Sequence, residues 1–279
     1  KCNEFKKQIN YSRKLIKENL SNISDNYDFF ITGSDQVFNY KLTGKDGTYL
    51  LDFVTNKCKC NSYAASFGVS NIPEEMLRWY MELLKDYHYI TVREKTAVDI
   101  LEKILHKRVE VVSDPCMLLS KDEWKKVTKI PDIKKPYILV YQLSVSPDIV
   151  NMAKKISKQE NLKIIFIPFP VGKPTLGRWK IGSGPAELLG YIQNAEYVLT
   201  DSFHGTLFSI IFNKKFFVQL SEGKVSSRIK DLLETYKLEN RILSKNVNYK
   251  EYIQYEYVNK IINQNKEYSY EILKRICDY

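Results

Sequence analysis

Residues 185–219 read PAELLGYIQNAEYVLTDSFHGTLFSIIFNKKFFVQ, and this stretch decides the fold. An amphipathic segment (185–194) leads into a short apolar run (197–200), then a second helical segment (206–212) and a second apolar run (216–219). The apolar runs do not alternate with polar residues, which is typical of strands that are buried on both faces. Helices that alternate with such strands predict an α/β unit built on a parallel sheet.

The same alternation continues along the chain and predicts two such units. The charged segment 129–136, KIPDIKKP, carries two prolines and is the expected boundary. We therefore predict one unit over residues 1–130 and a second over residues 131–279, the latter with a helical tail (246–279). Further strands are expected at 29–32, 60–64, 89–92, 109–112, 137–143 and 163–167, and further helices at 73–85, 95–105, 147–159 and 227–236.

Composition limits the classes of function. Of the 279 residues, 44% are apolar and 27% are charged, as in ordinary globular chains, and no apolar run is long enough to span a bilayer. The net charge of +10 comes from lysines scattered over helix faces, without the basic and aromatic array that stacks nucleic-acid bases. Five cysteines and no secretory leader favour a cytoplasmic location. No further Cys or His lies near Cys58 and Cys60, so no metal site is expected.

Four short polar or glycine-containing segments directly follow expected strands. Open parallel sheets bind ligands beyond the carboxyl ends of their strands, so these segments are candidates for a site. They are 33–36 (GSDQ), 66–68 (SFG), 93–94 (RE) and 201–205 (DSFHG).

Three of these segments also have structural explanations. Ser34 or Asp35 could cap a helix, and the small residues of SFG could serve close packing. Arg93 presents a planar fork of donors suited to carboxylate or phosphate, but it could equally form an ion pair with Glu94 or Asp99.

The segment DSFHG combines the most chemistry. An apolar strand delivers Asp201 and His204 to its carboxyl end, and a helix expected to start at Gly205 and Thr206 would present free amides and its positive end. A histidine in that position could move protons close to an anion near neutral pH. The alternative is a buried histidine whose hydrogen-bonding need is met by Asp201.

Taken in order, these segments resemble the polysaccharide pyruvyl transferase family. The resemblance runs from about Phe5 to about Leu243 and implies two Rossmann-like domains that face each other across a cleft, similar to the GT-B glycosyltransferase architecture. The family's first strand–helix unit is expected to be missing here. The motifs that carry the resemblance are YDFFITGSDQVF, SYAASFG, VRE before a helix, VVSDPCMLL followed by Trp124, and GPAELLGYIQNAEYVLTDSFHGTLFSIIFNKKFF.

The resemblance implies an activity. Family members attach pyruvate from phosphoenolpyruvate, as a cyclic ketal, to a sugar of a cell-envelope or capsular polysaccharide. We therefore expect a cytoplasmic bacterial transferase that needs no cofactor or metal. Its partners would be phosphoenolpyruvate, a sugar or lipid-linked oligosaccharide acceptor and, peripherally, the inner membrane surface, with no nucleic acid. A GT-B-like glycosyltransferase that uses a nucleotide sugar, and a non-catalytic glycan-binding relative, are the alternatives.

The resemblance also implies roles for residues. His204 falls on the family's catalytic histidine, and Arg93 on its donor-binding arginine. Many members have Arg-Leu-His where this chain has Ser202-Phe203-His204. The arginine is therefore missing. Arg178 or Lys180 in the loop expected at 171–184, or Arg228 at the start of the helix expected at 227–236, could replace it. We expect Arg228, because a cation held by a helix loses less freedom on binding. We expect catalytic roles for His204, Asp201 and Asp35, and substrate-binding roles for Arg93, Arg228, Ser202, Gly205, Ser34, Gln36 and Asp114.

Overall fold

The computed structural model describes most of the chain as two compact units. The N-terminal unit comprises residues 11–118 and 259–279, and the C-terminal unit comprises residues 119–258 with residues 1–10. The sequence also predicts a glycine-rich loop over residues 171–184, and most of this segment lies outside the described residues. The described residues are 7, 9, 19–69, 71–144, 146–168, 178–179, 183–220, 226–244 and 247–278.

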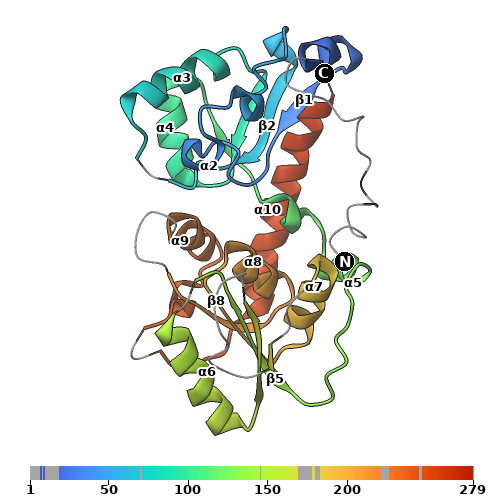
Figure 1. Cartoon of the computed structure of the whole chain (residues 1–279), viewed down its shortest axis with the longest axis vertical. Coiled ribbons are helices and arrows are strands. Elements are labelled where there is room, and N and C mark those ends of the chain that lie inside the picture. The colour runs from blue at the N-terminus through green and yellow to red at the C-terminus, as the bar shows by residue number, and fades with distance from the viewer. Residues whose placement is uncertain are drawn as a thin grey trace. The chain divides into compact units, whose positions relative to one another are not determined.

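The N-terminal unit contains a parallel sheet of four strands in the order β1-β2-β3-β4 (Figure 1). Helices α3 and α4 make the crossovers between neighbouring strands and pack on one face of the sheet through Tyr80 and Leu101. The elements are β1 (Phe30–Thr32), α2 (Tyr40–Thr43), β2 (Cys60–Ala65), α3 (Glu74–Leu84), β3 (Tyr89–Val92), α4 (Lys95–Leu105) and β4 (Glu110–Val111), with 3-10 turns η2 (Ser21–Asn26), η3 (Gly47–Leu50), η4 (Lys57–Lys59) and η5 (Pro115–Leu118).

The tail of the chain is one helix, α10 (Tyr255–Cys277), and its later turns belong to the N-terminal unit. Ile276 packs into an apolar cluster with residues of β2, and the Ser269 hydroxyl oxygen accepts a hydrogen bond from the Ser113 amide at 2.9 Å. Residues 259–279 therefore differ from the prediction, which placed the whole tail on the second unit. The contacts that hold them join segments far apart in the sequence.

The C-terminal unit contains a parallel sheet of five strands in the order β7-β6-β5-β8-β9. Ile138 and Val140 of β5 pack on α6, while the Tyr137 hydroxyl donates to the Tyr191 carbonyl of α7 at 2.8 Å, so helices cover both faces (Figure 1). The elements are α5 (Lys121–Lys125), β5 (Tyr137–Gln142), α6 (Pro147–Glu160), β6 (Lys163–Pro168), β7 (Arg178–Trp179), α7 (Pro185–Asn194), β8 (Tyr197–Thr200), α8 (Phe203–Ile211), β9 (Lys215–Val218), α9 (Ser226–Thr235) and η6 (Glu239–Arg241).

The start of the C-terminal unit also differs from the prediction, because residues 119–130 belong to it. Trp124 of α5 meets the ring of Phe208 edge-on, with 5.0 Å between the ring centroids. The Lys129 amide donates to the Ala186 carbonyl at 2.9 Å. These contacts attach residues 119–130 to helices α7 and α8 of the C-terminal unit.

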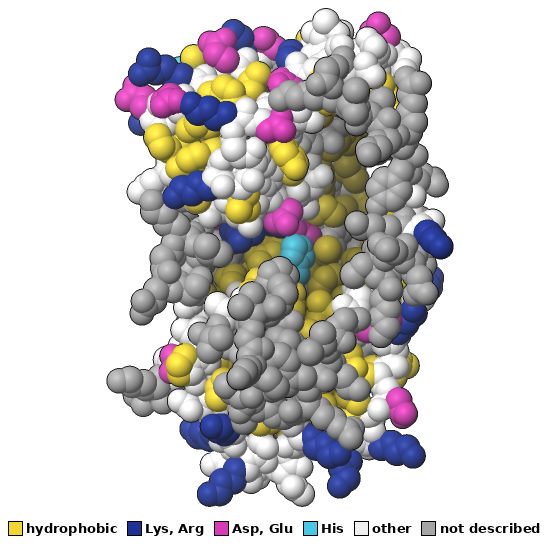
Figure 2. All heavy atoms as spheres, viewed as in Figure 1, with side chains coloured by type: hydrophobic (Ala, Val, Ile, Leu, Met, Phe, Trp, Pro, Cys, Tyr) yellow, Lys and Arg dark blue, Asp and Glu magenta, His cyan; other side chains and the backbone are white. Residues whose placement is uncertain are grey.

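The surface of the helices agrees with the predicted scatter of lysines. Figure 2 shows lysine and arginine side chains on the C-terminal unit in the region of α6, where Lys154, Lys155 and Lys158 are exposed. Within the described part of the chain, no helix combines the length and the apolar character needed to cross a membrane.

The loop after β1 packs closely against β2 and against the loop that follows β2. Gly33 has φ +125°, and a Cβ atom at this position would clash with the carbonyl oxygen of Tyr63. The side-chain oxygen of Gln36 lies against Gly68, which has φ +60°, and accepts a hydrogen bond from the Asn39 amide group at 2.8 Å. Asn39, rather than either residue predicted as a cap, caps α2. The loop after β1 therefore depends on backbone geometry that only glycine adopts easily.

We expect Gly33→Ala to destabilise the fold by more than the roughly 1–3 kcal/mol that a strained backbone alone costs. The added methyl group must also displace the β2 backbone. Gly44→Ala is the matched control, because Gly44 also has positive φ (+65°) but open space around the Cβ position. Urea unfolding followed by circular dichroism would measure both variants. Equal losses of unfolding free energy would show that the contact with Tyr63 is unimportant.

Candidate active site

In the C-terminal unit, the strand order reverses between β5 and β8, and such a switch point is where open parallel sheets bind ligands. Asp201, directly after β8, joins the two strand ends. Its carboxylate accepts hydrogen bonds from the Leu143 amide (2.6 Å), the Ser144 amide (2.9 Å) and the Ser144 hydroxyl (2.5 Å). These bonds hold the loop after β5. The sequence left open a hydrogen bond between Asp201 and His204. In the structure, the Asp201 carboxylate binds Leu143 and Ser144 instead.

Ser202 is the N-cap of α8. Its hydroxyl oxygen accepts from the Gly205 amide at 3.2 Å, and its carbonyl accepts from the Thr206 amide at 2.9 Å. The helix therefore begins three residues earlier than expected, and the two amides predicted to be free for an anion are used within the helix. The structure gives Ser202 a capping role, for which serine is among the preferred residues.

Gly205 allows the first turn of α8 to lie close to the sheet. A Cβ atom there would lie 2.5 Å from the Thr200 hydroxyl oxygen and 3.0 Å from a ring carbon of Tyr141. Burial raises the pKa of Tyr141, and a hydrogen bond with Ser202 opposes part of this rise. Tyr141 thus lies beside the site, although the sequence showed only its place in an apolar run.

His204 is the second residue of α8 and is half-buried. Its ring meets the ring of Phe203 edge-on, with 5.3 Å between centroids. Arg228 on α9 is buried and places its guanidinium carbon 5.8 Å from the centroid of the same Phe203 ring. Phe203, which sequence reasoning did not select, therefore brings the predicted acid–base residue and the predicted replacement cation into one neighbourhood at the switch point.

In the N-terminal unit, Arg93 is surrounded by carboxylates. It donates to Asp114 at 2.7 Å and to Asp35 at 3.2 Å, and its Nε lies 3.9 Å from a carboxylate oxygen of Glu94. The side chains of Arg93, Glu94 and Asp114 are buried, whereas that of Asp35 is 59% exposed. The structure thus shows the ion-paired alternative for Arg93, with Asp114 and Asp35 as main partners instead of Asp99. Its donor-binding role stays a prediction.

Glu94 is a structural residue of this region that the candidate set missed. Its Oε1 accepts hydrogen bonds from the Ser66 hydroxyl at 2.7 Å and from the amides of Phe67 (3.0 Å) and Gly68 (3.4 Å). The VRE and SFG motifs are therefore bound to each other. The available signal was an acidic residue at a strand end, opposite a loop of small residues.

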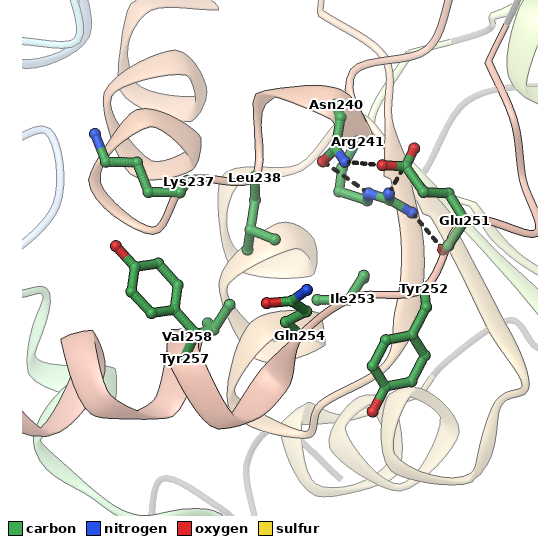
Figure 3. A pocket seen from close by; sticks show the side chains of 10 residues that line it. All are labelled: Lys237, Leu238, Asn240, Arg241, Glu251, Tyr252, Ile253, Gln254, Tyr257 and Val258. Atoms are coloured by element: carbon green, nitrogen blue, oxygen red, sulfur yellow. Dashed lines mark hydrogen bonds and ion pairs between the residues drawn. The ribbon is translucent and has the colours of Figure 1, made fainter.

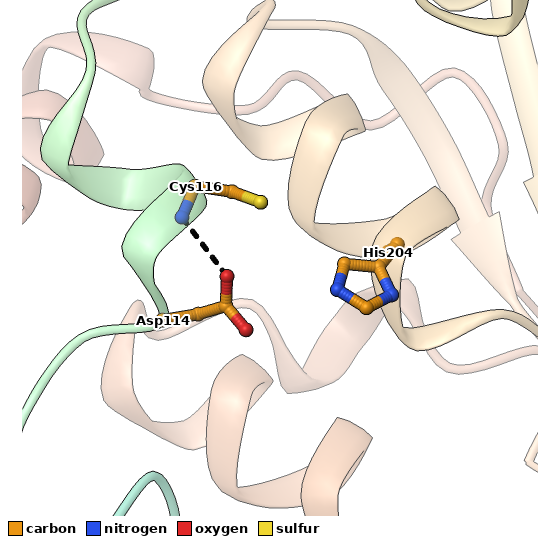
Figure 4. Close-up of side chains that lie close together, drawn as sticks. All are labelled: Asp114, Cys116 and His204. Carbon is orange, nitrogen blue, oxygen red and sulfur yellow. Dashed lines mark hydrogen bonds between the residues drawn. The ribbon is translucent and has the colours of Figure 1, made fainter. Parts of the chain in front are cut away.

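Asp114 also shapes the turn after β4. Its Oδ1 accepts from the Cys116 amide at 2.9 Å (Figure 4). Its carbonyl accepts from the Met117 amide at 2.8 Å. Burial raises the pKa of the Cys116 thiol, and the Asp114 carboxylate adds to this effect. Cys116 is therefore a neutral thiol near pH 7 and a poor nucleophile.

A family model described as polysaccharide pyruvyl transferase matches residues 1–218. The chain belongs to the polysaccharide pyruvyl transferase family. This confirms the resemblance drawn from the ordered motifs, and the matched region ends with the last residue of β9. No curated protein matches the chain.

Solved structures share the fold at low sequence identity. UDP-GlcNAc 2-epimerase of Methanocaldococcus jannaschii, in complex with UDP-GlcNAc and UDP, is 16% identical, with a TM-score of 0.51 over 92% of this chain and 80% of its own. S. aureus MnaA with UDP is 12% identical, with a TM-score of 0.51 over 90% of this chain and 73% of its own. These likenesses confirm the predicted class of two Rossmann-like units of the GT-B type. The cleft expected between the units stays a prediction.

Proposed function

We propose that this chain transfers a pyruvyl group from phosphoenolpyruvate to a sugar of a cell-envelope or capsular polysaccharide and forms a cyclic ketal. Membership of the family supports pyruvyl transfer to a polysaccharide. Within the molecule, the observation that carries the proposal is the grouping of His204 and Arg228 about the Phe203 ring at the switch point. That grouping offers a proton-transfer residue and a cation for an anionic donor.

The proposed reaction balances without a redox step. Two hydroxyl oxygens of one sugar bond to C2 of the donor, the bond from C2 to the phosphate oxygen breaks, and C3 becomes a methyl group. One hydroxyl proton ends on C3 and the other leaves with phosphate. His204 takes a hydroxyl proton as general base and delivers a proton to C3 as general acid. We propose that these steps proceed without a cofactor or metal.

Arg228 takes the place of the arginine that the motif lacks. Its planar fork suits the donor's carboxylate or phosphate, and its charge would stabilise the phosphate as it leaves. Because α9 and the Phe203 ring hold this side chain, little side-chain freedom is lost when the donor binds.

Replacing Arg228 tests this part of the proposal. Hydrogen bonds to charged groups contribute about 1.5–3 kcal/mol, so we expect Arg228→Ala to bind phosphoenolpyruvate about 10- to 100-fold more weakly. Arg228→Lys should also lose affinity, because lysine keeps the charge but not the fork. Isothermal titration calorimetry would measure affinity, with Lys230→Ala, an exposed position on the same helix, as control. Wild-type affinity in both Arg228 variants would remove Arg228 from the site.

A donor screen separates this proposal from the nucleotide-sugar alternative. We expect phosphoenolpyruvate to raise the melting temperature of the full chain, and uridine and guanosine diphosphate sugars to leave it unchanged. The reverse result would favour a glycosyltransferase.

We further propose that the acceptor is a lipid-linked oligosaccharide at the cytoplasmic face of the bacterial inner membrane, because a net charge of +10 is attracted to anionic lipid.

A further inference from the structure

A hollow in the C-terminal unit shares no residue with the switch-point site. It lies between η6 and the start of α10, has a volume of about 260 Å³ and is lined by residues within 237–241 and 251–258 (Figure 3). Its floor is apolar, since Leu238, Ile253 and Val258 are all buried.

One wall of the hollow is a fixed polar cluster. The Asn240 amide group donates to Glu251 Oε1 at 2.7 Å, and Arg241 Nε donates to the Asn240 side-chain oxygen at 3.0 Å. Arg241 also pairs with Glu251 Oε2 at 3.1 Å (Figure 3). The amide and carboxylate groups are therefore held in place before any ligand binds. The buried guanidinium already has a carboxylate as its counter-ion.

Two exposed aromatic rings complete the lining. Tyr252 is 79% exposed and Tyr257 is 53% exposed. Figure 3 shows Tyr257 on the same side as Lys237, Tyr252 below the Glu251 cluster and Gln254 between them. The hollow therefore combines flat apolar rings, hydroxyl groups, two side-chain amides and a carboxylate around an apolar floor.

We propose that this hollow is an oligosaccharide-binding site that holds a segment of the acceptor glycan; the choice of a glycan rests on the proposed function. A sugar ring presents an apolar face of C–H groups and an edge of hydroxyls. The tyrosine rings suit the first, and the polar groups of Asn240, Glu251 and Gln254 suit the second.

A phosphorylated ligand fits less well. Of the two cations that line the hollow, Arg241 is paired with Glu251, which leaves Lys237 for a phosphate. Nucleotide sites usually offer several donors to each phosphate, such as backbone amides or a fork of arginine. The charges of this lining therefore favour a neutral glycan over a nucleotide.

A second glycan site would raise the local concentration of the acceptor for the whole molecule. Long oligosaccharides should then have a lower KM than short ones, with little change in kcat. Alanine variants of Tyr252 and Tyr257, the two tyrosines at the rim of the hollow, should remove this advantage for long acceptors and leave short acceptors unaffected.

Binding can be measured without turnover. The full chain would be applied to an array of bacterial cell-envelope oligosaccharides, and the best binder titrated by calorimetry into wild type, Tyr252→Ala and Tyr257→Ala. We expect each rim variant to bind at least about tenfold more weakly. Tyr49→Ala, which removes a comparably exposed ring from the N-terminal unit, should bind like wild type. Both rim variants should keep the wild-type melting temperature.

Several results would overturn the inference: no oligosaccharide binding by wild type, unchanged affinity in both rim variants, or displacement of the bound oligosaccharide by UDP or inorganic phosphate. The proposed function fails separately. If the rim tyrosines bind oligosaccharide but phosphoenolpyruvate is never consumed, the glycan site stands and pyruvyl transfer does not. If phosphoenolpyruvate is consumed and the rim variants keep the wild-type KM for long acceptors, pyruvyl transfer stands and the glycan site does not.

Discussion

His204→Ala is expected to lower turnover by about 10²–10⁴-fold, the usual cost of losing a general acid or base, while the chain stays folded. The side chain is only half-buried, and Ser202 supplies the cap of α8, so removal of the imidazole leaves the start of the helix intact. Release of phosphate from phosphoenolpyruvate in the presence of acceptor would measure turnover, and thermal unfolding would measure stability. His88→Ala, which changes an exposed histidine of the other unit, is the control and should retain turnover.

Two outcomes would contradict the role given to His204. Wild-type turnover in His204→Ala would exclude it as the proton-transfer residue. A large fall in melting temperature would instead favour the alternative drawn from the sequence, in which His204 is a structural residue that stabilises the fold.

Arg93→Ala should destabilise the protein by about 3–5 kcal/mol, because it leaves the buried carboxylate of Asp114 without its cation. The matched control is Arg78→Ala. Arg78 pairs with Glu74 at 3.8 Å on the surface, where such pairs contribute about 0–1 kcal/mol. Urea unfolding of the full chain would compare the two variants. Adding Asp114→Asn to Arg93→Ala should recover part of the loss, since the uncompensated charge is then removed.

The same experiment tests the donor-binding role implied for Arg93 by the family resemblance. If Arg93→Ala unfolds at nearly the wild-type urea concentration yet binds phosphoenolpyruvate much more weakly, the residue acts mainly on the donor. The ion-paired arrangement of Arg93 would then be a resting contact that the donor replaces.

Local sequence patterns predicted most of the strands and most of the helices well, but β7 (Arg178–Trp179) lies in a segment that was expected to be a loop. The run 197–200 is apolar at every position but its last, and it forms β8, which is buried throughout. The start of α8 was misplaced although the signal was present, because Ser202 precedes the helix in a favoured capping position. The family's motifs, taken in order, predicted the fold class that the solved structures share.

Long-range contacts could not be read from the sequence. Asp114 and Asp35 lie 21 and 58 positions from Arg93, and the pairing of strands β1 to β4 brings the segments that carry them together. Ser113 and Ser269 are 156 positions apart, so no local sequence pattern predicts that the later turns of α10 belong to the N-terminal unit. The neighbourhood of Arg228 and His204 likewise depends on how α9 packs on α8. Such contacts follow from tertiary packing rather than from the periodicity of single segments.

The most direct test of pyruvyl transfer is mass spectrometry of the oligosaccharide panel after incubation with phosphoenolpyruvate and the full chain in D₂O. The account predicts an oligosaccharide that gains one pyruvyl ketal with a single deuterium in its methyl group, because one exchangeable proton is delivered to C3. The His204→Ala variant should form this product about 10²–10⁴-fold more slowly under the same conditions. Unmodified oligosaccharides and intact phosphoenolpyruvate would contradict it.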